Sequence, residues 1–480
     1  MSNYKHPFQP FNYLADRAEE NAEGLLFDGI DVQASNSFAY VYVKKLSNLF
    51  RELGIKKGDT IALDLPGPLH IMFMLATWHE AAISVAIAPL QKQNLSWLPD
   101  WLFTTEEYPK SFAKNIIKVH ESFSTLIENQ NLSSEPKYFD SKKSIVKVLF
   151  SSGTTGAPKA IPITIGQLEA RQEIANDYWF NFGSFMSCFR LTAIGGFPAF
   201  FFQLNLNLPY LLPRDSGQQL KLINKHDVTA LTGSPNQILD LVELVERSGS
   251  HPKNLRNVLI GGSKISVNIA ERIERVLSTK LINTYGATET GFVSRRVGGS
   301  LDPSDLGEIS KGVSVKIFDM EFNESDEIKE GLIGVKSPQC VFGYFRDEES
   351  TDKFFKNGWF FSGDIGRIEG GNHLFLDGRI DERINSGGIK IDPTKIENYI
   401  VGKFQVLDSG GFSYEGEKGI ELFGLGLVSN EEIDFEAVMS TLVSEFQAKA
   451  PSKLFQIDKI PRNENGKIDR VKLKEIVFKV

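Results

Sequence analysis

The stretch Ser151-Ser-Gly-Thr-Thr-Gly-Ala-Pro-Lys159 carries the strongest local signal in the chain. It follows an apolar run at 145–150 and precedes a second one at 160–163, and both predict short strands. Four hydroxyl side chains and two glycines in six residues disfavour a helix or strand, but they can present backbone N–H groups and hydroxyls to a polyanion. The glycine spacing is not that of a Walker loop. The stretch therefore predicts a phosphate-binding loop, with a flexible hydroxyl-rich turn as the alternative.

The elements around this loop follow an α/β pattern. Thr164 and Gln167 form a capping-box signature, which predicts a helix directly after the second strand. Strand and helix patterns alternate again over 207–247 and 257–284, as expected for βαβ layers with a parallel sheet. Other expected elements are helices at 13–21, 42–53, 71–82, 431–449 and 471–478, and strands at 60–65 and 454–457. The predicted fold class is α/β, with α+β character in the C-terminal part.

Two stretches depart from this alternation. The segment 121–143 is rich in Ser, Asn and Glu and predicts a surface connection. Short strands with glycine turns over about 298–378 predict a small β-rich subdomain. At roughly 150 residues per domain, a chain of 480 residues is long enough for two to four domains.

Composition excludes some classes of partner. The 53 Lys and Arg against 61 Asp and Glu give a net charge of -8, which disfavours nonspecific binding to nucleic acid or to an anionic membrane. The two cysteines are too few for a disulfide framework and favour a cytoplasmic location. The most apolar stretches, 71–90 and 191–212, contain polar residues and do not predict a membrane span.

Four further stretches follow the phosphate loop in a fixed order. They are Tyr285-Gly-Ala-Thr-Glu-Thr290, Phe361-Ser-Gly-Asp364, Asp377-Gly-Arg-Ile-Asp-Glu-Arg383 and Pro461-Arg-Asn-Glu-Asn-Gly-Lys467. Together with residues 151–159 they resemble the ordered motifs of the adenylate-forming (AMP-binding) superfamily, in its acyl-CoA ligase branch. The resemblance covers nearly the whole chain. It implies a large multi-subdomain N-terminal domain, 1–380, and a small mobile C-terminal domain, 381–480, with a hinge near Asp381.

The resemblance also implies cofactors and residue roles. ATP brings about four negative charges, so Mg²⁺ is expected between its phosphates and a carboxylate, for which Glu289 is the candidate. Lys467, Thr288 and Glu289 are the implied catalytic residues, because a lysine can meet the charge that develops at the α-phosphorus. The implied ATP-binding residues are Ser151, Ser152, Gly153, Thr154, Thr155, Gly156, Lys159, Gly261, Gly262, Ser263, Tyr285, Gly286, Asp364 and Arg379.

Each of these residues has a structural alternative. Glu289 would suit the first turn of a helix, Thr288 a cap, Tyr285 a core position, and Gly261-Gly262 a plain turn. A structural ion pair would explain Asp364 and Arg379 as well as a ribose site does. Asp381 and Lys467 would be ordinary solvated charges if their motifs were accidental.

The second half reaction is indicated by Ile384-Asn-Ser-Gly-Gly-Ile-Lys-Ile-Asp-Pro393. This stretch resembles the version found in acyl-CoA ligases, and it implies that Ser386, Gly387 and Gly388 face the pantetheine arm of coenzyme A. The structural alternative for Gly387 and Gly388 is a pair of turn glycines. The alternative acceptor is the phosphopantetheine of a separate carrier protein. Two further alternatives are a nucleotide-binding protein without catalysis and a luciferase-like oxygenation.

The acid is the least specified part of the reaction. Family members often carry an aromatic residue and His before a Gly-Gly turn, where this chain has Thr192 and Ala193 before Gly195. These residues are the expected acyl pocket, and Arg190 is a candidate partner for a second carboxylate, with a surface ion pair as the alternative. The chain length and the run after Ile384 are similar to those of o-succinylbenzoate–CoA ligases, while aryl and medium-chain acids remain alternatives.

Overall fold

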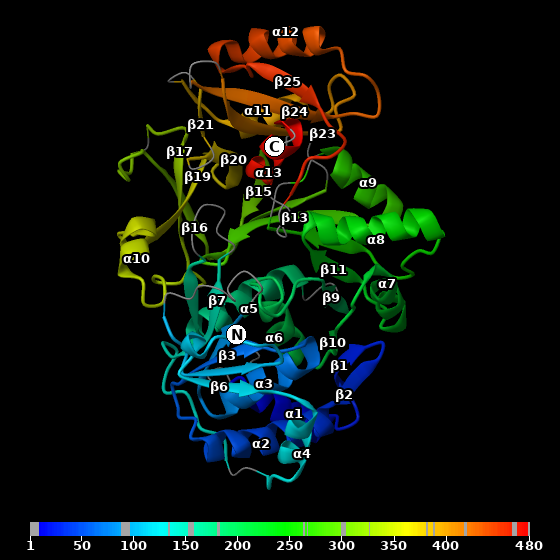
Figure 1. Ribbon diagram of the computed structural model, residues 1–480, viewed down its shortest axis with the longest axis vertical. Coiled ribbons are helices and arrows are strands. Elements are labelled where there is room, and N and C mark those ends of the chain that lie inside the picture. Colours follow the sequence, from blue (N-terminus) through cyan, green and yellow to red (C-terminus); the bar gives the residue numbers. More distant parts are fainter. Residues whose placement is uncertain are drawn as a thin grey trace.

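The computed structural model describes residues 9–87, 97–132, 135–151, 158–179, 183–262, 265, 267–298, 304–325, 327–380, 383–386, 389–416, 420–462 and 468–478. The N-terminal elements lie at one end of an elongated molecule and the C-terminal elements at the other (Figure 1). Mixed helices and sheets confirm the predicted α/β class.

A six-stranded sheet carries the phosphate-loop stretch. Its order is β6-β5-β3-β4-β7-β8, with parallel pairing except between β7 and β8. The strands are β3 (Thr60–Asp64), β4 (Ile83–Ala86), β5 (Trp101–Thr104), β6 (Asn115–Lys118), β7 (Ile145–Phe150) and β8 (Ala160–Thr164). Helices α1 (Asn12–Glu20), α2 (Asn36–Leu53) and α3 (Gly67–His79) share one large apolar core with this sheet.

A larger sheet forms the middle of the molecule. Within the described residues it joins eleven strands: β9 (Phe185–Ser187), β11 (Ala230–Gly233), β12 (Asn257–Ile260), β13 (Lys280–Ala287), β14 (Gly291–Val297), β15 (Asp305–Ile309), β16 (Ser314–Phe318), β17 (Gly331–Lys336), β18 (Phe355–Lys356), β19 (Trp359–Glu369) and β20 (His373–Arg379). Strands β9, β11, β12 and β13 are parallel, and β14 to β20 continue the sheet in antiparallel pairing. The region at about 298–378, which was expected to be rich in strands, therefore extends the sheet that β9, β11, β12 and β13 begin.

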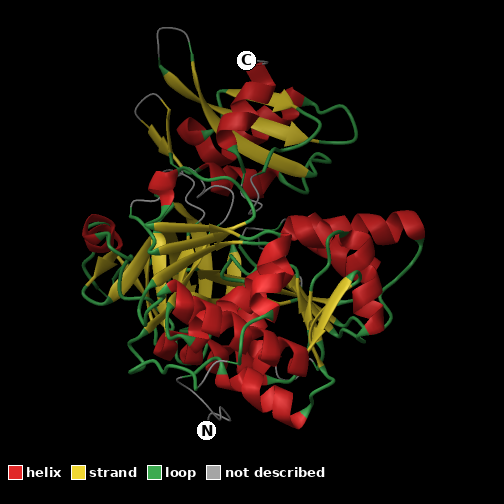
Figure 2. Ribbon diagram, turned by 60° about the horizontal axis from the view of Figure 1, so that its bottom comes forward, coloured by secondary structure: helices red, strands yellow, loops and turns green. Residues whose placement is uncertain are grey.

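Helices cover the parallel half of this sheet (Figure 2). They are α5 (Ile165–Trp179), α6 (Phe197–Asn205), α7 (Ser216–Lys225), α8 (Pro235–Ser248) and α9 (Val267–Leu277). One apolar cluster joins α7, α8 and α9 to the sheet, and a second lies between the sheet and α5 and α6. A short sheet of β1 (Leu25–Gly29), β2 (Val32–Ser35) and β10 (Tyr210–Leu211) links the N-terminal helices to this part.

The residues after 383 form sheets of their own. Strands β21 (Ile384–Ser386) and β22 (Ile389–Ile391) make a hairpin, and β23 (Asp408–Glu415), β24 (Glu421–Val428) and β25 (Lys453–Gln456) make a three-stranded sheet. Helices α11 (Pro393–Ile400), α12 (Phe435–Phe446) and α13 (Arg470–Phe478) pack on them, and α10 (Glu348–Phe354) belongs to the large sheet's region. Two apolar clusters consist entirely of residues after 383.

Two local expectations need correction. Helix α2 begins at Asn36, six residues before the expected start, because Ser35 caps it by accepting a hydrogen bond from the Phe38 N–H at 3.2 Å. The polar segment 121–143 was expected to be a surface connection, but it contains α4 (Glu121–Glu128), whose Phe123 and Ile127 are buried one turn apart.

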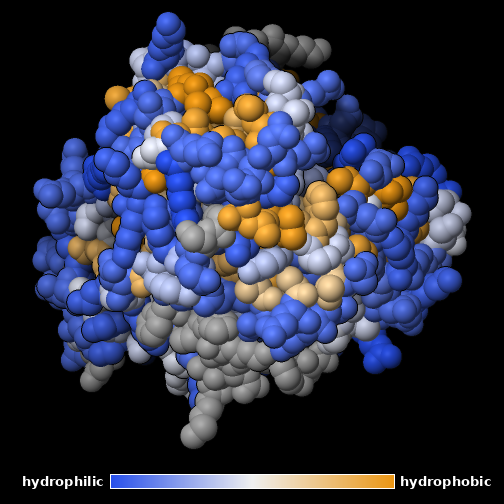
Figure 3. Space-filling view, turned by 90° about the horizontal axis from the view of Figure 1, so that it is seen from below, coloured by the Kyte–Doolittle hydropathy of each residue, from blue (hydrophilic) through white to orange (hydrophobic). Residues whose placement is uncertain are grey.

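The surface and the helices show two further properties. On the face seen in Figure 3, hydrophobic residues form small patches among hydrophilic ones. Among the described residues, no helix combines the length and apolar character that a membrane span requires.

Candidate active site

The carboxyl ends of four parallel strands meet along one edge of the large sheet. Turn residues follow there directly: Cys188 after β9, Ser234 after β11, Gly261 after β12, and Thr288 after β13. In open α/β sheets ligands bind outside this edge. The expected acyl, adenine and magnesium residues therefore lie along one side of one sheet.

The phosphate-loop stretch connects two antiparallel strands, as expected. The Ser151 N–H donates to the Lys159 carbonyl at 3.0 Å, and the Lys159 N–H donates to Ser151 Oγ at 3.1 Å. These two bonds close the base of the loop. The predicted capping box is confirmed, since the Thr164 N–H donates to Gln167 Oε1 at 2.9 Å and the Gln167 N–H to Thr164 Oγ1 at 3.3 Å.

Thr288 and Glu289 lie in the tight turn between β13 and β14. The Ala287 N–H donates to Thr290 Oγ1 at 3.0 Å, which closes this turn. Gly286 is required beside it, because a Cβ there would lie 2.0 Å from the Gly291 carbonyl oxygen. The alternatives that placed Glu289 in a first helical turn and Thr288 at a cap are wrong, since no helix begins at this turn.

Glu289 is a buried carboxylate with a neutral hydrogen-bond donor. The Tyr344 hydroxyl donates to its Oε1 at 2.8 Å, and among the described residues no Lys, Arg or His forms an ion pair with it. No group of three or more His, Cys, Asp or Glu side chains suited to a metal occurs in the described part of the chain. A single carboxylate without a cationic partner fits Mg²⁺, which is held largely by substrate phosphates and water.

The residues expected to bind ribose come together with Tyr285. Asp364 Oδ2 accepts hydrogen bonds from the Tyr285 hydroxyl at 2.6 Å and the Ser362 hydroxyl at 2.8 Å. Arg379 Nη1 lies 3.3 Å from Asp364 Oδ1, and its Nη2 donates to the Ser362 carbonyl at 3.0 Å. Burial and the neighbouring Asp364 carboxylate raise the pKa of Tyr285 well above its usual value, so its hydroxyl stays protonated. Asp364 therefore forms the ion pair with Arg379 that was the structural alternative, and its carboxylate also suits the two hydroxyls of a ribose.

The glycine pair after β12 has a steric reason. A Cβ on Gly261 would lie 2.7 Å from Thr284 Oγ1, and Gly262 has a φ of +89°. Side chains other than hydrogen are disfavoured at both positions. The pair thus presents bare backbone at the sheet edge, beside the strand that carries Tyr285.

Several expected site residues lie outside the described part of the chain. They are Ser152, Gly153, Thr154, Thr155, Gly156, Ser263, Asp381, Gly387, Gly388 and Lys467. Ser386 is described, and it pairs with Ile389 across the β21–β22 hairpin. On either side of the Lys467 stretch, Arg462 and Ile468 form a β-bridge, and Arg462 Nη2 lies 2.8 and 2.9 Å from the two Asp408 carboxylate oxygens.

The expected acyl residues form a turn between β9 and α6. The Ala193 carbonyl accepts from the Gly196 and Phe197 N–H groups at 3.1 and 3.0 Å, so the turn leads directly into α6. A Cβ on Gly195 would lie 2.3 Å from the Phe189 ring. Thr192 and Ala193 are half-buried, and Arg190 is exposed without an ion pair to any described residue. Their contact with an acid stays a prediction.

Sequence reasoning missed two residues that hold this site in place. Arg171 on α5 is buried and its Nη2 donates to the carbonyls of Thr288 at 2.8 Å and Gln339 at 3.1 Å. Tyr344 was missed as well. Neither residue belongs to a recognisable motif. Their partners, two backbone carbonyls for Arg171 and the Glu289 carboxylate for Tyr344, lie more than fifty residues away in sequence.

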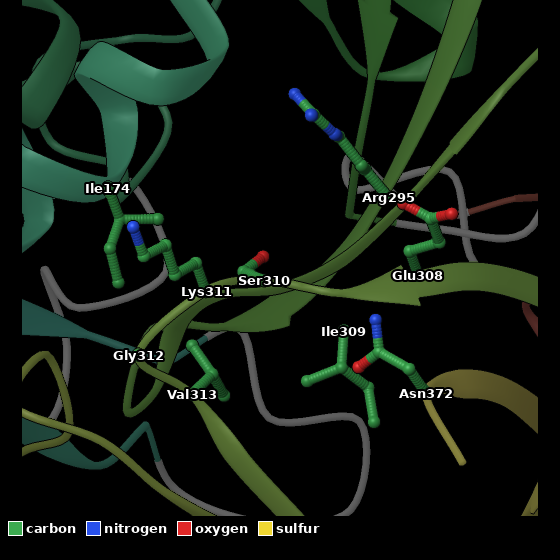
Figure 4. A pocket seen from close by; sticks show the side chains of 9 residues that line it. All are labelled: Ile174, Arg295, Glu308, Ile309, Ser310, Lys311, Gly312, Val313 and Asn372. Atoms are coloured by element: carbon green, nitrogen blue, oxygen red, sulfur yellow. The ribbon is translucent and has the colours of Figure 1, made fainter.

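Sequence reasoning also missed a pocket of about 490 Å³ between α5 and the turn after β15 (Figure 4). Arg295 and Glu308 come from paired strands, and the Lys311 side chain extends from the turn after β15 toward Ile174 of α5. Its apolar wall includes Ile174 and Val313, which belong to the same cluster as Phe292. The full lining is Ile174, Arg295, Glu308, Ile309, Ser310, Lys311, Gly312, Val313 and Asn372.

Comparison with known families agrees with this arrangement. The family model described as AMP-binding enzyme matches residues 101–345, which is more than half of the chain. The chain belongs to the AMP-binding enzyme family. The matched range contains the phosphate-loop stretch, the glycine pair and the Thr288–Glu289 turn.

Curated members of the AMP-binding family resemble the chain over nearly its full length. The 2-succinylbenzoate–CoA ligase of Bacillus subtilis (strain 168) is 23% identical over 488 residues, covering 97% of each chain. The long-chain-fatty-acid–CoA ligase of the same organism is 25% identical over 497 residues, covering 90% of this chain and 88% of the relative.

Solved structures of the AMP-binding family share the fold. The o-succinylbenzoate CoA synthetase of Bacillus subtilis, in complex with its acyl-adenylate intermediate, has a TM-score of 0.79 at 21% identity, covering 96% of this chain and 98% of that one. ATP-bound MatB from Rhodopseudomonas palustris has a TM-score of 0.82 at 20% identity, covering 98% of both chains.

Proposed function

We propose that the protein is an AMP-forming carboxylate–CoA ligase. In the first step an oxygen of the substrate carboxylate attacks the α-phosphorus of ATP, and pyrophosphate leaves. In the second step the sulfur of coenzyme A attacks the acyl carbon, AMP leaves, and the thiol proton passes to solvent. The substrate supplies the nucleophile in both steps, so the protein has to align the reactants and stabilise charge.

The observation that carries this proposal is a pair of carboxylates that hydroxyl groups hold in place. Asp364 accepts from the Tyr285 and Ser362 hydroxyls beside Arg379 and suits a ribose diol. Glu289 accepts from the Tyr344 hydroxyl with no cationic partner among the described residues and suits magnesium. Glu289 would hold magnesium, and the bound ion would supply neutralisation of phosphate charge. The likeness to two CoA ligases over about nine-tenths or more of the chain supports coenzyme A as acceptor.

The two-domain division is part of the proposal. We place the boundary near Asp381, with residues 1–380 as the large domain and 381–480 as the small one. Apolar clusters confined to residues after 383 support this boundary. An ion pair between Lys395 Nζ and Glu330 Oε1, at 3.0 Å, joins the two parts in the described arrangement.

The acyl pocket, the pantetheine contacts and the location are also proposals. Thr192, Ala193 and Gly195 follow the edge strand β9 and would meet the acid, while Ser386 with Gly387 and Gly388 would meet the pantetheine arm. Both cysteines are free thiols, which supports a reducing cytoplasm. The relatives support aryl acids carrying a succinyl group and fatty acids as the first substrates to test.

A panel of carboxylic acids tests the function. Pyrophosphate release should require ATP, Mg²⁺ and one class of acid, and coenzyme A should convert the acyl-adenylate to a thioester. Candidate carrier proteins serve as competing acceptors, and thioester formation on a carrier alone would overturn the coenzyme A assignment. ATP binding without pyrophosphate release over the whole panel would overturn catalysis itself.

A lysine variant tests the C-terminal motif. Lys467→Ala should abolish most adenylation and leave thioester formation from supplied acyl-adenylate intact. Lys474→Ala is the matched control, because Lys474 is an exposed lysine on α13 of the same domain. Equal adenylation in the two variants would show that Lys467 has no special role.

A further inference from the structure

The segment from Gln339 to Phe345 joins two parts of the proposed site. One is the turn with Thr288 and Glu289, called the magnesium turn below, and the other is the strand after the phosphate loop. At one end the Val341 N–H donates to the Glu289 carbonyl at 2.8 Å. At the other end the Phe345 N–H donates to the Ala160 carbonyl at 2.7 Å, one residue after Lys159. Backbone hydrogen bonds therefore tie this segment to both proposed ATP motifs.

Helix α5 holds the first part of this segment. Gln167 Nε2 donates to the Cys340 carbonyl at 2.9 Å, and Arg171 donates to the Gln339 and Thr288 carbonyls at 3.1 and 2.8 Å. Burial lowers the pKa of Arg171 to about 10, which leaves its guanidinium charged at neutral pH. A single buried cation thus fixes the magnesium turn and the segment beside it.

Tyr344 connects this framework to the ATP-binding side chains. Its hydroxyl donates to Glu289 Oε1 at 2.8 Å, and its ring lies 5.6 Å from Lys159 Nζ, which also lies 4.3 Å from the Phe354 ring centre. Burial and the Glu289 carboxylate raise the pKa of Tyr344, so the hydroxyl remains a donor. The ring is fixed edge-on against Phe354 and Phe355.

We propose that Tyr344 is a positioning residue for adenylation, which orients the Glu289 carboxylate toward magnesium and supports the Lys159 ammonium with its ring. The inference rests on the proposed function, because the expected effect is on the rate of adenylation. With Oε1 held by the hydroxyl, the second carboxylate oxygen of Glu289 has a fixed direction. The ring contributes separately, since an aromatic face attracts an ammonium group.

The hydroxyl and the ring can be tested separately. Tyr344→Phe keeps the ring and removes a hydrogen bond to a charged acceptor, a loss that corresponds to about a tenfold to hundredfold change in an equilibrium. We expect a rise of about tenfold or more in the Mg²⁺ concentration needed for half-maximal pyrophosphate release. The KM for ATP at saturating Mg²⁺ should change little. Tyr344→Leu should raise that KM as well, because Lys159 then loses one of its two aromatic neighbours.

A binding measurement gives a readout apart from activity. Mn²⁺ is titrated into the protein with α,β-methylene ATP and followed by electron paramagnetic resonance, and Tyr344→Phe should weaken Mn²⁺ binding by a similar factor. Tyr108→Phe is the matched control, since the Tyr108 hydroxyl donates to a different carboxylate, Asp64 Oδ2, at 2.9 Å. This variant should lower stability, but it should leave the Mg²⁺ dependence of pyrophosphate release and the binding of Mn²⁺ unchanged.

Two results separate the inference from the function on which it rests. If Tyr344→Phe lowers stability as Tyr108→Phe does but keeps wild-type metal dependence, Tyr344 is only structural and the inference fails. If the wild-type protein releases no pyrophosphate with any acid, the proposed function fails, while the Mn²⁺ titration still decides the role of Tyr344.

Discussion

Lys147, in the middle of β7, should make the stability of the protein depend on pH. Its side chain is fully buried, and its Nζ lies 3.2 Å from Met74 Sδ and 5.1 Å from the centre of the Phe197 ring. Among the described residues no carboxylate pairs with it, and the nearby His70 is also buried. Desolvation lowers the pKa of Lys147 from 10.5 to about 7.

The magnitude follows from proton linkage. Between pH 7 and 10.5 the unfolded chain binds a proton at this lysine that the folded chain releases, so stability rises with pH by about 1.4 kcal/mol per unit. Below pH 7 both states are protonated, and the full cost of burying the charge, about 5 kcal/mol for a shift from 10.5 to about 7, is present. A methionine side chain has a length similar to that of lysine but no charge. Lys147→Met should therefore stabilise the protein, and most strongly at low pH.

Urea unfolding at pH 7 and pH 9 measures this effect. The stabilisation by Lys147→Met should be about 2 kcal/mol smaller at pH 9 than at pH 7. Lys143→Met is the control, because Lys143 is exposed four residues earlier in the chain. A stabilisation that is the same at both pH values would refute the reasoning, since it would mean that Lys147 titrates alike in the folded and unfolded chains.

Other variants test the buried carboxylates and a required glycine. Glu80 is fully buried and its pKa is lowered to about 2 by hydrogen bonds that outweigh desolvation, so its contribution of about 3 kcal/mol is present above pH 4.5 and lost as the pH falls toward 2. Glu80→Gln should lower the free energy of unfolding by urea at pH 7, and it should make that free energy fall less steeply between pH 4.5 and 2. An unchanged pH dependence in this range would contradict the assignment. Gly286→Ala must move the Gly291 carbonyl, which would lie 2.0 Å from the new Cβ, and should reduce pyrophosphate release and lower the melting temperature together. Asp364→Asn should raise the KM for ATP by about tenfold or more while Mg²⁺ dependence stays unchanged, and a wild-type KM would show that Tyr285 and Asp364 form only a structural pair.

The ordered motifs selected two candidate nucleotide residues that the structure brings into contact. Tyr285 and Asp364 are separated by 79 positions, and the structure joins them by a hydrogen bond of 2.6 Å. The capping box at Thr164 was predicted correctly because its two hydrogen bonds are local in sequence. Local chemistry and motif order are properties that a sequence carries directly.

Other features depend on partners that a sequence does not mark. Arg171 acts on carbonyl groups 117 and 168 residues away, and any residue type could supply those carbonyls. Helix α4 was missed although Phe123 and Ile127 stand four residues apart, because the polar composition around them concealed a short apolar face. Sequence reasoning gave no sign that β14 to β20 would continue the sheet of β9 to β13.

The place of β9 in the large sheet bears on how substrate choice can change. The turn with Thr192 and Ala193 extends from a strand at the sheet's border, which is paired on one side by β11. The turns with Gly261 and Glu289 extend from strands paired on both sides. Exchanging residues 188–196 would therefore disturb few backbone pairings. Under the proposed acyl assignment, a grafted turn would change the choice of acid while the rest of the sheet stays in place.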